Sequence, residues 1–387
     1  MKKIKIIISA DLLPTIHNED LFSSGNMSEL LGDELNEIIQ QADFRIYNLE
    51  GPLIDTPSPI KKDGPIFDAS VKTAKGLVAM KSDLILLANN HILDHGGHGV
   101  ESTLSVLDSL KIPWIGVGLT QSQRSQVFYI RSSSLTIGVY NCCESEFSVV
   151  PEGQFGANAY NPMTVFDEIR FAKEKCDYLI VAYHGGKEKF RYPSPGLQDR
   201  FRLFAEKGAD IVIAQHTHCV GCFEMYNGSL LVYGQGNFLF GQSMDEFCSN
   251  GLLIRLIFSS KGFSYDWIPV LKKQYGVRLA NDFQSEQILS GFYYRSEKLL
   301  DENFIANEYR TLSMQAIDSY LLSLHGRTIF GRVCKKLALE KHYLNYIKKH
   351  CYDQQTLLCI YNSIRCEAHS ELLQCGLESL IEKGELK

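Results

Sequence analysis

The sequence lacks the features of a nucleic-acid-binding protein and of a membrane protein. It has no surplus of basic residues, because 39 lysines and arginines stand against 45 aspartates and glutamates and give a net charge of −6. We therefore expect no nucleic-acid partner. No apolar stretch is long enough to span a bilayer, so we expect no transmembrane anchor. The apolar run 4–9 is too short for a signal peptide and has no cleavage pattern after it, so we predict the first strand there.

The 11 cysteines lack the spacing of a disulfide framework. Their number is odd, Cys142 and Cys143 are adjacent, and several others lie near the C-terminus. In a chain of this size, that pattern favours reduced thiols and a cytoplasmic location. Cys219 and Cys222 form one C-x-x-C pair, but no second pair stands at zinc-ribbon spacing, so we expect no structural zinc there.

Strand-like and helix-like segments alternate over the first two-thirds of the chain. Short apolar runs predict strands at 4–9, 44–48, 83–88, 112–117, 135–141, 177–183, 210–214, 230–233 and 252–258. Amphipathic stretches predict helices at 28–41, 99–110 and 164–175. The alternation predicts a layered α/β fold in which helices cover the faces of the sheets. Two consecutive strands within 126–141 predict that part of the sheet is antiparallel.

The character of the chain changes at about residue 271. Proline and glycine become sparse, and helical patterns dominate at 303–324, 327–349 and 354–380. We therefore predict a main α/β domain over residues 1–270 and a mainly helical extension over 271–387. The extension carries no motif with chemistry of its own. We expect it to serve in packing, as a cap over the site, or as an interface with a partner protein.

The most informative segment is the glycine-bounded loop that follows the apolar run 83–87. It brings Asn90, His91 and Asp94 together. An asparagine oxygen is a neutral metal ligand, a histidine beside it can move protons, and an aspartate three residues later can orient that histidine. Taken alone, the segment is compatible with an ordinary structural loop and with part of a metal-assisted hydrolytic site.

Polar residues follow five further predicted strands in the same way. They are Asp11, Glu50, His184, the pair His216 and His218, and Asn237. Strands that run in the same direction end at one rim of a sheet, where their loops converge. In an extended segment, residues two apart point to the same side, so both histidines of the H-x-H pair could approach one centre. The mixed oxygen and nitrogen set suits Mn, Fe or Zn better than Ca or Mg.

In chain order, these motifs closely resemble the poly-γ-glutamate capsule-synthesis family of the CapA and PgsA type. The matching segments are Asp11, Asn48-Leu49-Glu50, 88–96, 184–188, 215–218 and 236–238. That family is related to the calcineurin-like metallophosphoesterases and 5′-nucleotidases, and the resemblance covers about residues 4–270. It implies a four-layer α/β/β/α sandwich with two mixed sheets, with one or two divalent metal ions held at the rim.

The resemblance also implies a role for each residue of the predicted site. The matched metal ligands are Asp11 and His218 for the first metal, Glu50 as the bridging carboxylate, and Asn90, His184 and His216 for the second metal. His91 would act as a general acid on a leaving oxygen, and Asp94 would hold its imidazole in the right tautomer. The metals would polarise a phosphoryl-type oxygen and supply hydroxide as the nucleophile.

Two residues depart from the metallophosphoesterase pattern. Leu13 stands where the Asp-x-His opening has its histidine, so the first site loses an imidazole and should bind its metal more weakly. Glu50 replaces the bridging aspartate and is one methylene longer. Both departures are usual in the capsule-synthesis group. They leave two hypotheses, a metal-dependent hydrolase of a phosphoester or related anionic substrate, and a non-hydrolytic accessory component of surface-polymer synthesis.

Five residues are weaker candidates for contacts with the ligands or with an anionic small-molecule or polymer substrate. Glu188, Glu224 and Asn237 match family positions, although a solvated carboxylate is an equal alternative for the two glutamates. Lys61 and Lys62 lie in a proline-flanked loop after the Glu50 motif. They are candidates to meet an anionic substrate, but the pattern favours a solvated surface for both.

Overall fold

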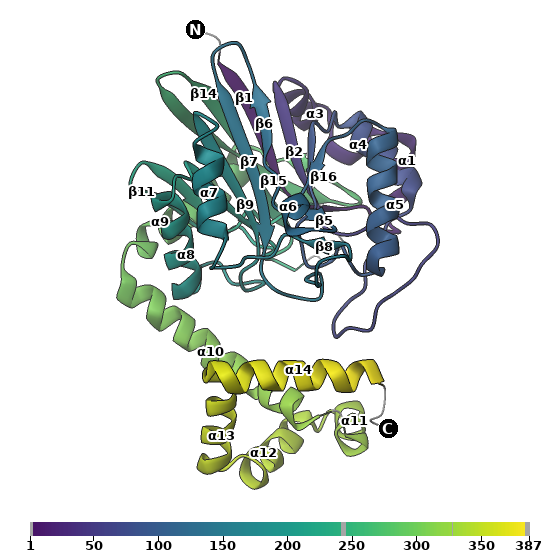
Figure 1. Ribbon diagram of the computed structural model, residues 1–387, viewed down its shortest axis with the longest axis vertical. Coiled ribbons are helices and arrows are strands. Elements are labelled where there is room, and N and C mark those ends of the chain that lie inside the picture. Colours follow the sequence, from purple (N-terminus) through teal and green to yellow (C-terminus); the bar gives the residue numbers. More distant parts are fainter. Residues whose placement is uncertain (1–2, 241–244, 327, 384–387) are drawn as a thin grey trace. The chain divides into compact units, whose positions relative to one another are not determined.

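The structure is a computed structural model that describes residues 3–240, 245–326 and 328–383 (Figure 1). The chain divides into two compact units, Met1–Ala306 and Asn307–Lys387. The first unit contains all the predicted site residues. The second unit is helical.

The larger sheet of the first unit contains the strands that carry the oxygen donors of the site. They are β1 (Ile4–Leu13), β2 (Phe44–Leu49), β3 (Leu84–Leu86), β4 (Trp114–Ile115), β13 (Asn237–Phe240), β14 (Asn250–Ser259), β15 (Gly262–Lys273) and β16 (Gly276–Leu279). Their order is β16-β15-β14-β1-β2-β3-β4, with β13 paired to β1. The run from β1 to β4 is parallel, whereas β14, β15 and β16 are antiparallel to their neighbours.

The smaller sheet contains the strands that carry the imidazoles. They are β6 (Phe128–Arg131), β7 (Thr136–Cys143), β9 (Tyr178–His184), β10 (Ile211–Gln215), β11 (Phe223–Tyr226) and β12 (Ser229–Val232). In the order β11-β12-β10-β9-β7-β6, the four central strands are parallel and the two edge strands are antiparallel. The antiparallel pair β6–β7 confirms the prediction made for 126–141. A separate short pair joins β5 (Val117–Gly118) to β8 (Gly156–Ala157).

Alternation along the strands packs the two sheets face to face. Ile6 and Ile8 of β1 belong to the core between the sheets, together with Ile180 and Ile213 of the smaller sheet. Ile7, between them in sequence, belongs instead to the core under the helices on the other side. Because both faces of β1 are buried, its sequence is a continuous apolar run rather than an alternating one.

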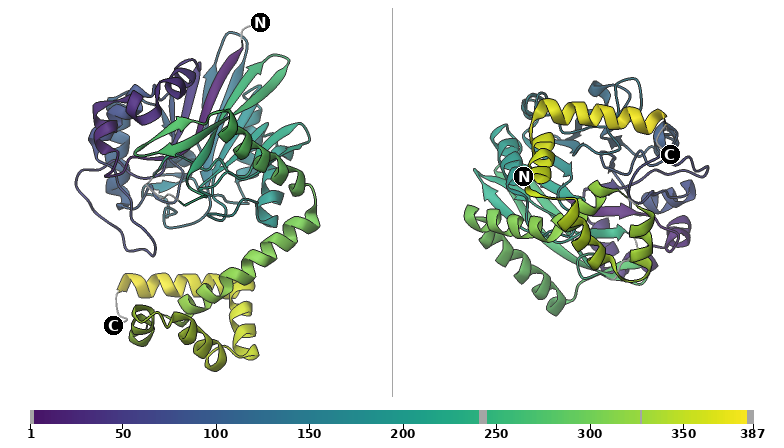
Figure 2. Two further views of the ribbon diagram at one scale, coloured as in Figure 1. Left: turned by 180° about the vertical axis from the view of Figure 1, so that it is seen from behind. Right: turned by 90° about the horizontal axis from the view of Figure 1, so that it is seen from below.

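Helices cover the outer faces of both sheets (Figure 2). They are α1 (Glu19–Ser24), α2 (Met27–Leu31), α3 (Asp33–Gln40), a 3-10 turn (Val71–Thr73), α4 (Ala74–Ala79), α5 (Gly96–Ser109), α6 (Gln121–Arg124), α7 (Val165–Lys173), α8 (Pro195–Glu206) and α9 (Asp282–Leu299). Buried side chains of α1 to α5 pack on the larger sheet, and those of α7 and α8 pack on the smaller sheet. The predicted α/β/β/α sandwich with two mixed sheets is thus confirmed.

One helix and one domain boundary differ from the sequence prediction. The predicted helix 28–41 is two helices, because Gly32 adopts a left-handed φ of 72° between α2 and α3. The main unit also continues past residue 270, since β15 crosses that position and α9 packs on the sheet. Phe292 of α9 lies 5.1 Å from Phe223 and 4.9 Å from Trp267, measured between ring centroids. The compact units divide only after Ala306.

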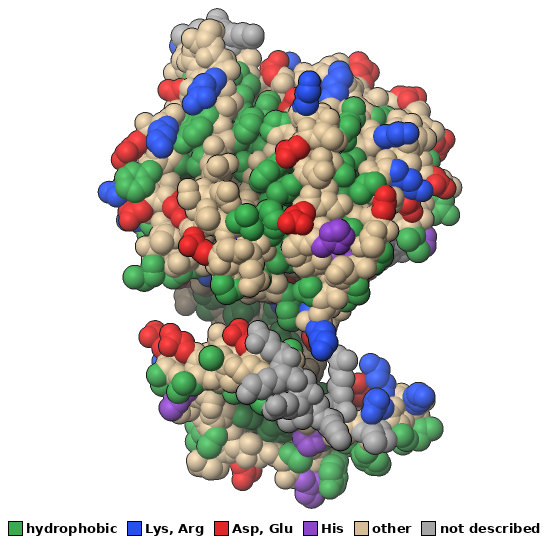
Figure 3. All heavy atoms as spheres, turned by 45° about the vertical axis from the view of Figure 1, so that its right-hand side comes forward, with side chains coloured by type: hydrophobic (Ala, Val, Ile, Leu, Met, Phe, Trp, Pro, Cys, Tyr) green, Lys and Arg blue, Asp and Glu red, His purple; other side chains and the backbone are tan. Residues whose placement is uncertain are grey.

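The C-terminal helices are α10 (Glu302–His325), which begins in the first unit, α11 (Ile329–Lys336), α12 (Glu340–His350), α13 (Gln354–Arg365) and α14 (Glu367–Lys383). A small core of Cys334, Tyr343 and Ile347 holds part of the second unit together. Within the described ranges, no helix has the length and hydropathy needed to cross a bilayer. On the face of the first unit seen in Figure 3, acidic and basic side chains are interspersed.

Candidate metal centre

Both sheets deliver polar side chains to one rim. Asp11 lies in β1, Glu50 follows β2, Asn90 follows β3, His184 ends β9, and His216 and His218 follow β10. Asp11 is in register with Asn48 on one side and with Asn237 on the other. In the smaller sheet, His184 is in register with Gln215, the residue before His216. The convergence of strand ends therefore places all the predicted ligands in one region.

Glu50 lies at the centre of the cluster. Its Oε1 atom is 3.4 Å from His184 Nε2, 3.7 Å from His218 Nε2 and 3.9 Å from His216 Nδ1. Within the described part of the chain, neither carboxylate oxygen of Glu50 has a hydrogen-bond partner, and the same is true of His216 Nδ1. A buried carboxylate without a donor is costly unless a cation compensates it. A metal ion bound here would pair with these unpaired ligand atoms.

Two overlapping groups of donors could hold metal ions. Glu50, His216 and His218 form one group, and Asp11, Glu50 and His184 form the other. In each group the donor atoms lie within 4.8 Å of one another. Glu50 belongs to both groups, as expected of a bridging carboxylate. The residues of this site are therefore compatible with one or two metal ions, and the mixture of carboxylate and imidazole is a common set for transition metals.

Asp11 is fixed by its neighbours before any ligand binds. Its Oδ1 accepts a hydrogen bond from Asn48 Nδ2 at 2.8 Å, and its Oδ2 accepts one from the backbone N–H of His216 at 3.0 Å. The same Oδ2 lies 3.4 Å from His218 Nδ1. Burial and the nearby Glu50 carboxylate raise the pKa of Asp11. Two carboxylates this close favour a bound cation, which would relieve both effects.

The charges at the centre are balanced by imidazoles. Burial alone would raise the pKa of Glu50, but the nearby His218 and His184 hold it well below the usual range. Burial lowers the pKa of His184, which favours the neutral form that ligates metals. His184 Nε2 lies 3.0 Å from Asn90 Oδ1, so two of the three predicted ligands of the second metal are in direct contact.

Asn48 has a role that the sequence analysis missed. Its Nδ2 group is 2.8 Å from Asp11 Oδ1 and 3.2 Å from His184 Nδ1, so one amide orients a carboxylate of one sheet and an imidazole of the other. The only sequence signal was its place in the Asn48-Leu49-Glu50 motif. Asn48 stands two residues before the ligand Glu50, and residues two apart on a strand point to the same face. Its position could therefore have predicted this role.

The histidine pair after β10 is not extended, contrary to our prediction. β10 ends at Gln215, and both His216 and His218 have left-handed backbone angles, with φ of 88° and 50°. Such angles in residues other than glycine cost on the order of 1–3 kcal/mol each and tend to occur at functional sites. The rings still converge on Glu50, and His218 Nδ1 lies 2.8 Å from Asn237 Oδ1.

The His91 side of the loop forms a separate ion-paired group. His91 Nδ1 lies 2.6 Å from Asp94 Oδ2, as the predicted acid pair requires. The backbone N–H of Phe67 donates to the same oxygen at 2.7 Å, and the Phe67 ring lies 4.4 Å from the His91 ring. Asp94 therefore has several partners that fix its position.

Lys62 is buried, whereas the sequence favoured a solvated surface. Its side chain is 4% exposed, its Nζ atom pairs with Asp94 Oδ1, and it lies 3.2 Å from His91 Nδ1. The loop that carries Lys62 folds over the Asp94 carboxylate, and this contact spans 32 positions of the sequence. Lys61, the adjacent residue, is exposed as predicted.

Two glutamates stand at the edge of the cluster beside His216. Glu144 Oε1 is 3.8 Å and Glu188 Oε1 is 3.9 Å from His216 Nε2. The Glu188 side chain is 49% exposed, so it borders the solvent side of the site. Glu144 was not predicted, although it follows directly after β7, where the strand-end argument would have found it. Burial raises the pKa of Glu144.

Glu224 lies in β11 and is held by other partners. It accepts hydrogen bonds from Arg202 Nε at 3.1 Å and Nη2 at 2.9 Å, and from the Tyr233 hydroxyl at 2.7 Å. The fork from Arg202 is bidentate, which is a strong geometry for a carboxylate. Among the contacts of the described residues, none joins Glu224 to a predicted metal ligand. The structure therefore gives Glu224 a structural ion pair rather than a place in the cluster.

We expect Glu224→Gln to lower stability without changing metal content. The substitution leaves the partly buried Arg202 with only the exposed Glu302 carboxylate, 3.6 Å away, as a charge partner, at a cost of about 1–3 kcal/mol. Thermal unfolding and metal analysis of the same preparation would measure both effects. Glu101→Gln, on the exposed side of α5, is the control. A loss of bound metal in the Glu224→Gln variant would show instead that Glu224 contributes to metal binding.

Comparisons with known proteins identify the family of this chain. The family model for the bacterial capsule synthesis protein PGA_cap matches residues 9–242. The capsule biosynthesis protein CapA of Bacillus anthracis is 22% identical over 250 residues, which are 62% of this chain and 61% of that protein. The PGA biosynthesis protein CapA of Bacillus subtilis (strain 168) is 25% identical over 209 residues, which are 53% of this chain and 55% of that protein.

Each match spans less than two thirds of the curated relative. Among solved structures, a novel phosphatase from Mycoplasma pneumoniae superposes with a TM-score of 0.45 at 15% identity, over 76% of this chain and 99% of that one. The segment matched by the family model runs from before Asp11 to beyond Asn237, and so it contains the whole cluster. The chain belongs to the family of the bacterial capsule synthesis protein PGA_cap.

Proposed function

We propose that this chain is a metal-dependent hydrolase that acts on a phosphoester or a related anionic substrate, in the context of capsule synthesis. The observation that carries the proposal is the buried Glu50 carboxylate, which lies among three imidazoles with no hydrogen-bond donor from the described residues. A carboxylate in such a position serves metal binding better than it serves folding, since the surrounding imidazoles stabilise its charge but donate no hydrogen bond to it.

In this proposal, the residues divide between two metal positions. By the family resemblance, Asp11 and His218 would hold the first and Asn90, His184 and His216 the second, with Glu50 shared. The donor distances instead group His216 with His218, and Asp11 with His184, around Glu50. The nitrogen-rich set favours Mn, Fe or Zn. A divalent metal bound there supplies Lewis-acid polarisation of a phosphoryl-type oxygen and a nucleophile at neutral pH. Glu188 and Glu144 border the solvent side and would face the substrate.

His91 is proposed as the general acid. Its Nδ1 atom is engaged by Asp94, which leaves Nε2 to carry the proton that a leaving oxygen needs. Asp94 stabilises the imidazolium and fixes the tautomer, because it is itself held by Lys62 and by the Phe67 backbone. His91 is not among the groups that could hold a metal, so it is free for this role.

Metal analysis of the purified full-length protein tests the proposal. We expect stoichiometric transition metal in the wild type and its loss in the double variant Asn90→Ala/His216→Ala. A panel of phosphomonoesters and phosphodiesters with added Mn then tests hydrolysis. His98→Ala is the matched control, because His98 is exposed on α5. Wild-type protein without bound transition metal after exposure to Mn, Fe and Zn would refute the proposal.

A second candidate function is a non-hydrolytic accessory component of poly-γ-glutamate or other surface-polymer synthesis. Leu13 favours it, because this residue is 2% exposed, belongs to the core and cannot ligate a metal. A protein partner for the helical C-terminal region belongs to this candidate. Exposed apolar side chains on α14, including Leu372, Leu373 and Leu377, support such a partner.

Complementation of a deletion strain separates the two functions. The hydrolase requires His91, so His91→Ala should abolish polymer production. An accessory component should tolerate His91→Ala but fail when residues 307–387 are deleted, since the first unit is compact up to Ala306. A cytoplasmic location is part of both proposals, and it is supported by the 11 cysteines, all within the described part of the chain and all free thiols. Cell fractionation tests it.

A further inference from the structure

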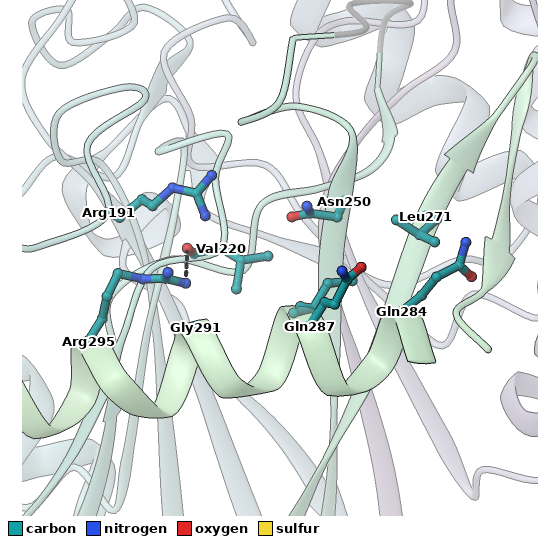
Figure 4. A pocket seen from close by; sticks show the side chains of 9 residues that line it. Arg191, Val220, Asn250, Leu271, Gln284, Gln287, Gly291 and Arg295 are labelled. Carbon is teal, nitrogen blue, oxygen red and sulfur yellow. Dashed lines mark hydrogen bonds between the residues drawn. The ribbon is translucent and has the colours of Figure 1, made fainter. Parts of the chain in front are cut away.

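A polar cavity lies in the first unit, between α9 and the beginning of β14. Its volume is about 300 Å³. Arg191, Arg295, Asn250, Gln284 and Gln287 contribute polar side chains to it, as Figure 4 shows. Three of these residues lie along one side of α9, and the helix is held on the sheet by the stacking of Phe292 on Phe223. We call this cavity the arginine pocket.

Two guanidinium groups face the arginine pocket, and the described residues that line it include no acidic side chain. Arg295 donates from Nε to the carbonyl of Gly221 at 2.8 Å and from Nη2 to the carbonyl of Val220 at 3.0 Å. These carbonyls orient the Arg295 fork but do not neutralise it. Burial and the nearby Arg191 lower the pKa of Arg295, as expected for two like charges in one cavity.

Among the described residues, the carboxylates that interact with Arg191 are Asp245 and Glu246, and neither lines the pocket. The Arg191 guanidinium lies 4.8 Å above the Phe247 ring, and its Nη2 atom is 3.6 Å from Glu246 Oε1. The Glu246 side chain is 77% exposed, so water screens most of that attraction. No aspartate or glutamate lines the pocket among the residues that the structure describes. The cavity is therefore electropositive, and an oxyanion would relieve the repulsion between its two arginines.

Asn250 adds a second requirement for the ligand. Its Oδ1 atom is buried and has no hydrogen-bond donor in the described part of the chain. Figure 4 shows the Asn250 amide between Arg191 and the glutamines of α9. A buried acceptor that lacks a donor is costly, and a ligand that supplies the donor removes the cost. The ligand should thus carry a hydrogen-bond donor close to its negative charge.

We propose that the arginine pocket is a binding site for a small oxyanion, a carboxylate or a phosphate, with a hydrogen-bond donor beside the charged group. Arg191 and Arg295 bind the oxygens, Asn250 accepts from the neighbouring donor, and Gln284 and Gln287 complete the polar wall. A planar guanidinium suits both oxyanions, because its N–H groups form paired hydrogen bonds with two oxygens.

The site is separate from the metal centre but shares its loops. Arg191 lies in the loop that follows the ligand His184, and Val220 comes two residues after the ligand His218. A backbone bridge between Gly236 and Gly251 also joins the strand of Asn250 to the segment of Asn237. Occupancy of the arginine pocket would therefore stabilise the loops that carry the imidazoles.

Calorimetric titration of the full-length protein after treatment with EDTA tests the inference, because removal of metal excludes binding of the probe at the metal centre. The probes are inorganic phosphate, N-acetylglycine, which has a carboxylate next to an amide N–H, and the neutral N-acetylglycinamide. We expect one site per chain for at least one charged probe and no binding of the neutral one. The comparison of the two charged probes identifies the oxyanion.

Variants locate the binding. Arg191→Gln should lower the affinity for the charged probe by about tenfold or more, since a charge-assisted pair is lost. Asn250→Asp, which is nearly isosteric, should abolish binding by placing a carboxylate in the pocket. Arg170→Gln, on the exposed side of α7, should have no effect.

The ligand-free melting temperature of each variant shows whether it is folded. Arg191 is the primary position because, unlike Arg295, its guanidinium donates no hydrogen bond to a backbone carbonyl of the described residues. Failure of both charged probes to bind, or equal binding by the wild type and folded Arg191→Gln, would overturn the inference. Neither result would affect the metal proposal, because these titrations contain no metal.

Discussion

Replacing Glu50 with glutamine should abolish metal binding without unfolding the protein. The substitution keeps the size of the side chain and removes one negative charge from a fully buried position. In the metal-free protein this charge has only the surrounding imidazoles as partners, at 3.4 Å or more. In the metal-bound protein it would serve both donor groups. The substitution should therefore reduce the stability of the metal-bound state and leave that of the metal-free state almost unchanged.

Thermal unfolding with and without Mn measures this difference. A metal present at 100 times its dissociation constant stabilises the folded state by about 2.7 kcal/mol, which raises the melting temperature of a unit of this size by about 5 °C. The wild type should show this rise, and Glu50→Gln should show none. Glu101→Gln, exposed on α5, should behave as the wild type does. A normal Mn-dependent rise in Glu50→Gln would refute its assignment as the shared ligand.

The sequence predicted the parts of this structure that depend on local patterns and on the rule of converging strand ends. The buried parallel strands are continuous apolar runs, so their positions were clear, and the ligands follow them directly. β1 nevertheless continues to Leu13, beyond the predicted end at residue 9, because Asp11 and Leu13 pair with β13. That pairing joins segments more than 200 positions apart and leaves no local signal.

The parts that the sequence could not predict depend on long-range contacts. Lys62 is hydrophilic and stands in a proline-flanked loop, so its burial against Asp94 has no signal in the local pattern. Glu224 was assigned to the site by its match to a family position, but its ion pair with Arg202 shows a different environment. The arginine pocket is formed in part by α9. The change of composition near residue 271 assigned this helix to the extension, so its packing on the main sheet was not predicted.

Replacing His91 with alanine should reduce hydrolysis while leaving the metal content intact. His91 is 6% exposed and contacts Asp94 rather than the donor groups of the metal centre. Loss of a general acid lowers kcat by about 10²- to 10⁴-fold. The loss should be largest for substrates with poor leaving groups, such as alkyl phosphoesters. For p-nitrophenyl esters it should be much smaller, because that leaving oxygen needs no proton.

The dependence on the leaving group distinguishes a proton donor from a residue that merely shapes the site. A structural role for His91 would reduce the hydrolysis of all esters by the same factor, and it would lower the affinity for substrate or metal as well. His98→Ala, in the exposed part of α5, controls for the loss of an imidazole. Equal losses for alkyl and p-nitrophenyl esters would refute the acid role.

Lys62 provides an independent test of the same group, because its ammonium and the His91 ring share the Asp94 carboxylate. Asp94→Asn should be strongly destabilising, by about 3–5 kcal/mol, since it leaves the Lys62 charge buried without a partner. The double variant Asp94→Asn/Lys62→Met removes that charge and should recover most of the stability but not the activity. Recovery of both stability and activity would show that Asp94 serves only the fold, and that His91 acts without an orienting carboxylate.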